Sequence, residues 1–270
     1  MNDPITWWQA IILGLTQGLT EFIPVSSSAH LNIVHWLMGQ KREAVFTYDM
    51  VLNLGTLAAL VYYFRHDWAN LLRDPSQRKL RNLVFIACVP AVIAGLLLRD
   101  LEDSHRLFVD VRFNAMMLIV MGMLLLWADH VGRKRRDLDQ ANWKDAVAVG
   151  CSQALALIPG VSRSGATLTA GLFRRLKRED AARFSFLMSL PITLGAVIYE
   201  IFGLFRQGGL SQVNAHPLNI LLGVLVAGAS GFWAISFLLN YLKTRSVTLF
   251  VVWRVVVALV VFALYPFLRS

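Results

Sequence analysis

Two short stretches of this 270-residue chain place ionisable side chains among apolar residues, where charge is costly. The first, QGLTEFIPVSSSAH, begins at Gln17 and carries Glu21 and His30 around three serines. The second, PGVSRSGAT, begins at Pro159 and carries Arg163 between two serines. If the two stretches meet, a carboxylate, an imidazole, a guanidinium and several hydroxyls share one pocket.

This set of groups is suited to attack on a phosphoryl group. Arg163 can bind phosphate oxygens bidentately and stabilise the charge that develops on them. The backbone N–H groups of SRSGAT, with Gly165 among them, form an anion cradle if a helix starts there, and PVSSSAH offers a second such start. His30 or Ser27 could act as the nucleophile, with Glu21 as a base or orienting group.

The composition indicates where these residues lie. Hydrophobic residues make up 56% of the chain and charged residues only 16%, with a mean hydropathy of +0.55. These values exclude a disordered chain, a fibrous repeat or a disulfide scaffold and indicate an all-α polytopic membrane protein. The net charge of +9 would suggest a nucleic-acid partner in a soluble protein. Here we expect no such partner, because Lys and Arg are typical of cytoplasmic loops.

Apolar runs predict six membrane-spanning helices, while two further runs are broken in the middle. The six runs are 46–64, 82–98, 113–130, 184–205, 219–240 and 247–268. Residues 7–37 and 144–173 each carry a Pro and Ser cluster, which would expose unpaired backbone groups to lipid in a plain span. We therefore expect two re-entrant helical hairpins. The alternative for each is an ordinary span kinked at proline.

The broken runs also match one another at an offset of 136 residues. The matched pairs are Gln17 with Gln153, Val25 with Val161, Ser26 with Ser162 and Ser28 with Ser164. With one extra residue, TLAA from Thr56 matches TLGA from Thr193. The pattern predicts one membrane domain, 1–270, built from repeats of about 1–135 and 136–270. Each repeat has one hairpin and three spans, an odd number, so the second repeat has inverted topology.

The loop charges fit this topology. With hairpins that return to their own side, loops 65–81, 131–144, 174–183 and 241–246 share one face and carry 17 of the 26 Lys and Arg residues. By the positive-inside rule that face is cytoplasmic. Both termini, and a site reached through the first hairpin, are then expected on the extracytoplasmic side.

QGLTEFIPVSSSAH and PGVSRSGAT resemble the two signature motifs of the undecaprenyl-diphosphatase family, the bacitracin-resistance membrane phosphatases. The resemblance extends over essentially the whole chain. It implies hydrolysis of undecaprenyl diphosphate to the monophosphate and inorganic phosphate in the bacterial cytoplasmic membrane. That reaction recycles the lipid carrier for peptidoglycan synthesis.

The resemblance also implies roles for individual residues. Glu21, Ser27, His30 and Arg163 match the catalytic positions. The residues that match positions around the diphosphate are Gln17, Ser26, Ser162, Ser164 and Thr167. Many members have Glu where this chain has Gln17, and an amide cannot act as a base. The family depends on a divalent cation, Mg or Ca, but the sequence holds no metal-ligand cluster, so the metal ligands stay unknown.

Some alternatives stay open at this point. The sequence does not choose between His30 and Ser27, and Arg254, within the last span, suits either a structural pair or the site. Asn53 is expected to make a structural hydrogen bond. Paired hairpins also suit a transporter or flippase for a polyprenyl phosphate or another anion. An oligomer is compatible with the sequence.

Overall fold

The computed structural model describes residues 4–40, 42–97, 110–132, 135–158, 160–206, 209 and 213–268. In these ranges the chain is helical, and two isolated β-bridges, Ile5–Ala215 and Arg136–Leu176, tie its connections. The α-helices in chain order are α1 (Trp7–Phe22), α2 (Ser27–Leu37), α3 (Arg42–Tyr63), α4 (Arg65–Arg73), α5 (Arg78–Leu97), α7 (Val111–Val131), α8 (Trp143–Ala154), α9 (Arg163–Phe173), α10 (Arg178–Arg206), α11 (Pro217–Thr244) and α12 (Thr248–Leu268). The short 3₁₀ turns are η1 (Pro75–Gln77), η3 (Leu138–Gln140) and η4 (Leu155–Leu157).

Six helices in the described part of the chain are long and apolar enough to cross a membrane. The candidate spans are Val45–Tyr63, Pro75–Leu97, Val111–Val131, Arg178–Arg206, Pro217–Thr244 and Thr248–Phe267. Each coincides with one apolar run of the sequence, so the predicted polytopic all-α architecture is confirmed. Their outer faces carry many exposed large apolar side chains, as lipid contact requires.

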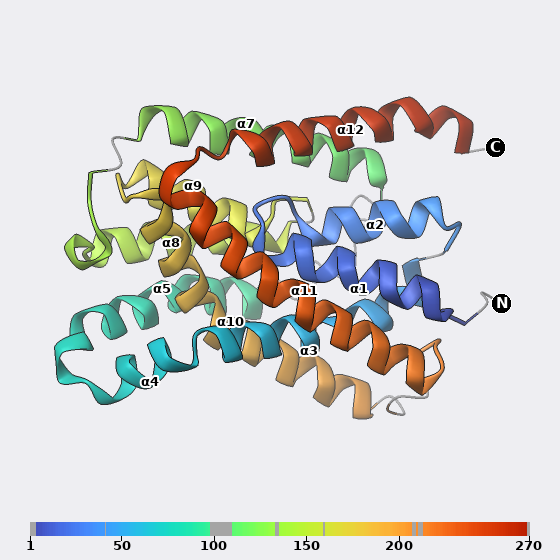
Figure 1. Ribbon diagram of the computed structural model, residues 1–270, viewed down its shortest axis with the longest axis horizontal. Helices are drawn as coiled ribbons and strands as arrows, with labels where there is room; N and C mark the ends of the chain where they lie inside the picture. Colours follow the sequence, from blue (N-terminus) through green and yellow to red (C-terminus); the bar gives the residue numbers. More distant parts are fainter. Residues whose placement is uncertain are drawn as a thin grey trace.

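The first broken run forms a helical hairpin. α1 ends at Phe22, because the residue before a proline is driven to extended backbone and Ile23 has φ −65° and ψ 136°. Pro24 also has no N–H with which to continue the helix. The chain then turns, and α2 runs back beside α1 toward the end from which α1 came (Figure 1).

The second broken run makes a similar hairpin from the opposite end of the bundle. α8 begins with a capping box in which Asn142 and Asp145 satisfy each other's backbone N–H groups. The helix passes through η4 and becomes extended at Ile158, and α9 returns from Arg163. The tips of the two hairpins lie near the middle of the bundle (Figure 1).

The four basic loops gather at one end of the bundle. Arg183 pairs with Asp67, and Lys177 Nζ lies 2.5 Å from Asp137 Oδ1, so three of these loops are joined to one another. Burial tends to raise the pKa of Asp145, but hydrogen bonds from Arg136 and Arg174 hold this pKa below its ordinary value. The start of α1 and the end of α12 both lie at the other end of the bundle, on the right of Figure 1.

Small residues let each hairpin approach a long helix very closely. A Cβ added at Gly14 would lie 2.6 Å from the Gly223 carbonyl oxygen on α11. In the second hairpin, a Cβ at Gly150 would lie 2.3 Å from the Ala87 carbonyl oxygen on α5. Such contacts between small residues are the usual basis of tight helix packing in membranes.

Replacing Gly18 by alanine is expected to destabilise the protein. The new Cβ would lie 2.5 Å from the Ala227 carbonyl oxygen and 2.8 Å from the Gly231 nitrogen, so α1 and α11 must separate. Overpacking of this kind costs about 1–3 kcal/mol, which thermal unfolding in detergent would detect as a lower Tm. The matched control is Gly95→Ala, where no atom lies within 4 Å and Tm should stay level or rise. Equal Tm values for the two variants would contradict the packing.

Candidate active site

The tips of the two hairpins contact each other directly. The Ser164 hydroxyl donates to the Ile23 carbonyl at 3.3 Å, and the Gly160 N–H donates to Ser28 Oγ at 3.5 Å. The two sequence motifs, more than 130 residues apart in the chain, therefore form one surface.

The N-cap residue directly before each returning helix is a serine with an unusual backbone. Ser26 has φ 77° and ψ 98°, and Ser162 has φ 70° and ψ 112°. Residues other than glycine rarely adopt positive φ, and such conformations cost of order 1–3 kcal/mol. Backbone strain of this size is typical of functional sites, where the surrounding packing holds it in place.

A pocket of about 260 Å³ opens at this junction. Its lining residues come from both tips and from the neighbouring spans. They are Glu21, Ser26, Ser27, Ser28, Ala91, Gln153, Ala154, Ala156, Leu157, Ser162, Arg163 and Ile192. The volume lies just below the range of about 300–1,000 Å³ usual for whole small ligands, so it suits a headgroup rather than a long lipid.

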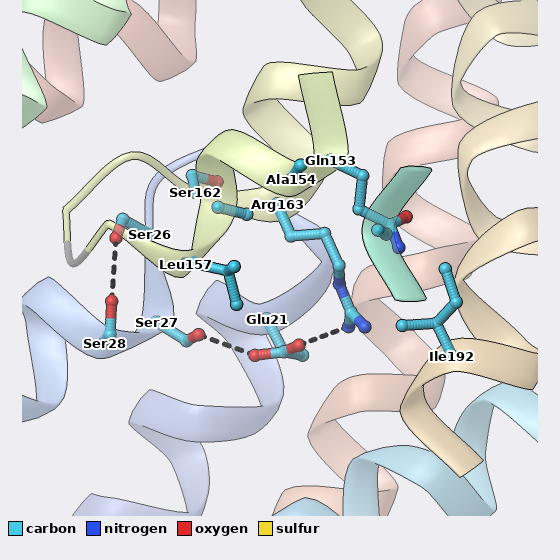
Figure 2. Close-up of a pocket in the computed structure, with 12 residues that line it drawn as sticks. Glu21, Ser26, Ser27, Ser28, Gln153, Ala154, Leu157, Ser162, Arg163 and Ile192 are labelled. Atoms are coloured by element: carbon cyan, nitrogen blue, oxygen red, sulfur yellow. Dashed lines mark hydrogen bonds and ion pairs between the residues drawn. The ribbon is translucent and has the colours of Figure 1, made fainter. Parts of the chain in front are cut away.

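Inside the pocket, three side chains form a continuous polar chain (Figure 2). Arg163 Nη2 donates to Glu21 Oε1 at 2.6 Å, which joins the second hairpin to the first. The Ser27 hydroxyl donates to the other carboxylate oxygen, Oε2, at 2.6 Å. A serine hydroxyl that donates to a carboxylate has a base in place to take its proton.

Neighbouring polar groups hold this chain in position. Arg163 Nη1 also donates to the Thr193 hydroxyl on α10. The Gln17 amide donates to Glu21 Oε2 at 3.3 Å and to Asn53 Oδ1 at 2.8 Å. The structural hydrogen bond expected of Asn53 is thus present. Asn53 holds the Gln17 amide, which in turn helps to position the Glu21 carboxylate.

His30 lies outside the pocket lining, with only 8% of its surface exposed. Its Nδ1 lies 2.8 Å from the Ser26 carbonyl oxygen, and its Nε2 lies 2.9 Å from the indole nitrogen of Trp253. Because a carbonyl only accepts and an indole N–H only donates, Nδ1 carries the proton and the ring is neutral. Both ring nitrogens are therefore engaged in hydrogen bonds.

The remaining predicted binding residues divide into two groups. Ser26 and Ser162 line the pocket, while Ser164, Gly165 and Thr167 are not among its lining residues. The Gly165 N–H donates to Ser162 Oγ at 3.1 Å, so the helix cap occupies it. The Thr167 hydroxyl is fully buried against Ser185. These three residues therefore stabilise the start of α9 and do not form part of the pocket surface.

Three polar residues at the site are not among the site residues expected from the sequence. In the sequence, Thr193 and Gln153 stand out only as residues that match between the two halves. Their polar side chains within apolar runs could have marked them as candidate site residues. Ser28 stands inside a recognised motif, but only the structure brings its hydroxyl to the pocket.

Arg254 binds the backbone of both hairpin tips. Its Nε donates to the Pro24 carbonyl at 2.7 Å, and its Nη2 lies 3.5 Å from the Val161 carbonyl oxygen. The side chain is fully buried, and within the described residues it forms no salt bridge with a carboxylate. Its positive charge therefore adds to that of Arg163 and favours an anionic ligand at the junction.

Replacing Arg254 by methionine is expected to lower both Tm and the catalytic activity of the site. The variant leaves two buried carbonyls without their donor, at a cost of about 1–3 kcal/mol each, and removes one of the links between the two tips. We expect kcat to fall by roughly 100-fold, by analogy with small misplacements of catalytic groups. The control is Val256→Met, at a half-exposed position on the same helix. Wild-type kcat in the Arg254 variant would contradict a role in positioning the tips.

Comparison with known proteins identifies the family. The model of the family described as bacitracin resistance protein BacA matches residues 10–260. A relative from Gemmatimonas aurantiaca named undecaprenyl-diphosphatase is 43% identical over 270 residues, covering 96% of this chain and 98% of its own. A Moorella thermoacetica relative with the same name is 44% identical over 267 residues, covering 97% and 98%. This all-helical chain, whose hairpins bring Glu21, Ser27 and Arg163 together, belongs to the bacitracin resistance protein BacA family.

Proposed function

We propose that this protein hydrolyses undecaprenyl diphosphate to undecaprenyl phosphate and inorganic phosphate, which recycles the lipid carrier for peptidoglycan synthesis and confers bacitracin resistance. Family membership and the names of the two relatives support this activity. The observation that carries the proposal is the chain from Arg163 through Glu21 to Ser27 inside a headgroup-sized pocket.

In the reaction we propose, Ser27 Oγ attacks the terminal phosphorus of the diphosphate. The Glu21 carboxylate takes the hydroxyl proton, and the bond from phosphorus to the bridging oxygen breaks. Undecaprenyl phosphate leaves with the bridging oxygen and accepts the proton from Glu21. Arg163 stabilises the charge that develops on the phosphoryl oxygens.

A second displacement completes the cycle. Water attacks the phosphorus of the phosphoserine, Glu21 takes a proton from that water, and the bond between phosphorus and Ser27 Oγ breaks. Glu21 returns the proton to the serine oxygen, and inorganic phosphate leaves.

We assign the nucleophile to Ser27 rather than His30. Ser27 lines the pocket and its hydroxyl already donates to a base, whereas both nitrogens of His30 are engaged outside the pocket. His30 then holds the tip of the first hairpin, since its Nδ1 donates to the backbone of Ser26.

We propose, from the family resemblance, that the reaction uses a divalent cation, Mg or Ca. Glu21 is the one carboxylate among the twelve lining residues, and no group of three or more potential ligands is found in the described residues. The site therefore fits a cation that receives most of its ligands from the diphosphate and water, the usual arrangement for Mg²⁺. Glu21 would be its protein ligand, and the bound ion would neutralise charge on the phosphoryl oxygens.

We also propose that the chain is one membrane domain of two inverted-topology repeats, about 1–135 and 136–270. Helix bounds support this: α2 and α9 differ by 136 residues at both ends, and α7 and α12 by 137. The two serines with positive φ, Ser26 and Ser162, occupy matched positions. So do Gly39 and Arg175, with φ of 67° and 68° after the two returning helices.

The membrane orientation is part of the proposal. We place the basic end of the bundle in the cytoplasm, following the positive-inside rule. Both termini and the mouth of the pocket then face the extracytoplasmic side of the bacterial cytoplasmic membrane, and the prenyl tail lies in lipid between spans.

Phosphate release tests the proposed activity. Purified protein in detergent should release inorganic phosphate from undecaprenyl diphosphate and from the shorter farnesyl diphosphate. An inert protein that moves labelled polyprenyl phosphate across liposome membranes would support the transporter alternative and contradict the phosphatase.

A further inference from the structure

Gln153 presents an unusual amide at the wall of the pocket. It stands in the last turn of α8 and lines the pocket, with 4% of its surface exposed. Its Oε1 and Nε2 are both buried, and neither has a hydrogen-bond partner within the described residues. Buried amides almost always have partners, so one that lacks them in a pocket points to a ligand.

The matched residue of the first half, Gln17, differs from Gln153 in having hydrogen-bond partners. The Gln17 amide is held by Glu21 and Asn53. At the positions that match these partners, the second half has Leu157 and Leu190, which cannot accept a hydrogen bond. Gln153 thus keeps the amide without the groups that satisfy it in the first hairpin.

We infer that Gln153 is a substrate-binding residue whose amide hydrogen-bonds the phosphate oxygens of the diphosphate headgroup, an inference that rests on the proposed function. In Figure 2 its carboxamide lies on the same side of the pocket as Arg163, toward Ile192. Nε2 has two hydrogens to donate to phosphate oxygens, and Oε1 can accept from a protonated phosphate oxygen. A prenyl tail could satisfy neither atom, which assigns the contact to the headgroup.

The geometry gives Gln153 and Arg163 different tasks. Arg163 supplies the charge, while a neutral amide adds directional donors without attracting other anions more strongly. Gln153 contributes to binding the ground state as well as the transition state, so its removal acts mainly on KM.

Gln153→Met tests the inference, because methionine matches glutamine in length and has neither donor. We expect KM for farnesyl diphosphate to rise about 10- to 100-fold, the effect of losing hydrogen bonds to a charged group, with a smaller change in kcat. Tm without ligand should stay level or rise, since an unpaired buried amide has been removed. Gln153→Glu should raise KM further, because a carboxylate repels the diphosphate.

The control is Ser152→Ala on the same helix, whose hydroxyl donates to the Val149 carbonyl within α8 and does not line the pocket. Its KM should equal that of the wild type. If Gln153→Met keeps the wild-type KM, or lowers Tm with KM unchanged, the amide is structural and the inference is overturned.

A binding measurement separates this inference from the proposed activity. Inorganic pyrophosphate should raise the Tm of the wild type, and Gln153→Met should lose most of that shift at the same concentration. A wild type that releases no phosphate from prenyl diphosphates contradicts the proposed function, while a pyrophosphate shift that depends on Gln153 still supports the headgroup contact. An equal shift in both proteins overturns the contact.

Discussion

Replacing Ser27 by alanine is expected to reduce phosphate release by about 10⁴-fold or more, the scale of removing a nucleophile. The Ser27 hydroxyl is 2.6 Å from Glu21 and opens into the pocket, so its loss removes the group that forms the covalent intermediate. Steady-state phosphate release from farnesyl diphosphate measures the effect. Ser28→Ala is the matched control on the same helix, and its activity should stay within about 10-fold, because its hydroxyl does not contact the base.

Trapping the intermediate identifies the nucleophile directly. Wild-type protein is mixed with a diphosphate labelled in its terminal phosphate and quenched in acid or in alkali. Phosphoserine survives acid and is lost in alkali, whereas phosphohistidine behaves in the opposite way. We expect acid-stable label on Ser27 and none in Ser27→Ala. Label on His30 would contradict the assignment.

Replacing Arg163 by methionine should lower kcat by about 10³- to 10⁵-fold, the range found for arginines that stabilise a transferring phosphoryl group. The same change leaves Glu21 without its counter-charge, which also lowers Tm. Arg163→Lys keeps the charge but not the planar pair of donors, and it should recover only part of the activity. The control is Arg245→Met, at an exposed position in a basic loop.

A double variant separates the two effects of Arg163. Glu21→Gln together with Arg163→Met removes both charges, so Tm should recover toward the wild-type value while activity stays lost. An active double variant would show that neither charge takes part in the reaction.

The spans and the meeting of the two motifs could be predicted from the sequence, because both follow from polarity. Apolar runs of sufficient length gave all six candidate spans, and the Ser and Pro breaks marked where helices stop. The ion pair between Glu21 and Arg163 also follows from polarity. An unpaired charge inside a membrane is costly, so charged side chains of opposite sign pair there.

Residue polarity does not predict which backbone groups a side chain binds, or which residues far apart in the sequence contact each other. Arg254 binds two backbone carbonyl groups, and because every residue has a carbonyl, the sequence does not show which ones it binds. The hydrogen bond from Trp253 to His30 joins positions 223 residues apart, and it alters how the histidine is interpreted. The binding role inferred for Gln153 depends on its amide having no hydrogen-bond partner in the described part of the chain, which only the structure reveals.

The close approach between α1 and α11 has a consequence for biogenesis. Gly14 on α1 contacts Ser230 on α11, 216 positions later in the chain. The hairpin that carries Glu21 therefore leaves the ribosome long before the surface that secures it has been made. An N-terminal fragment that stops before Pro217 should be degraded in cells, and synthesis of the missing C-terminal piece from a second plasmid should rescue it.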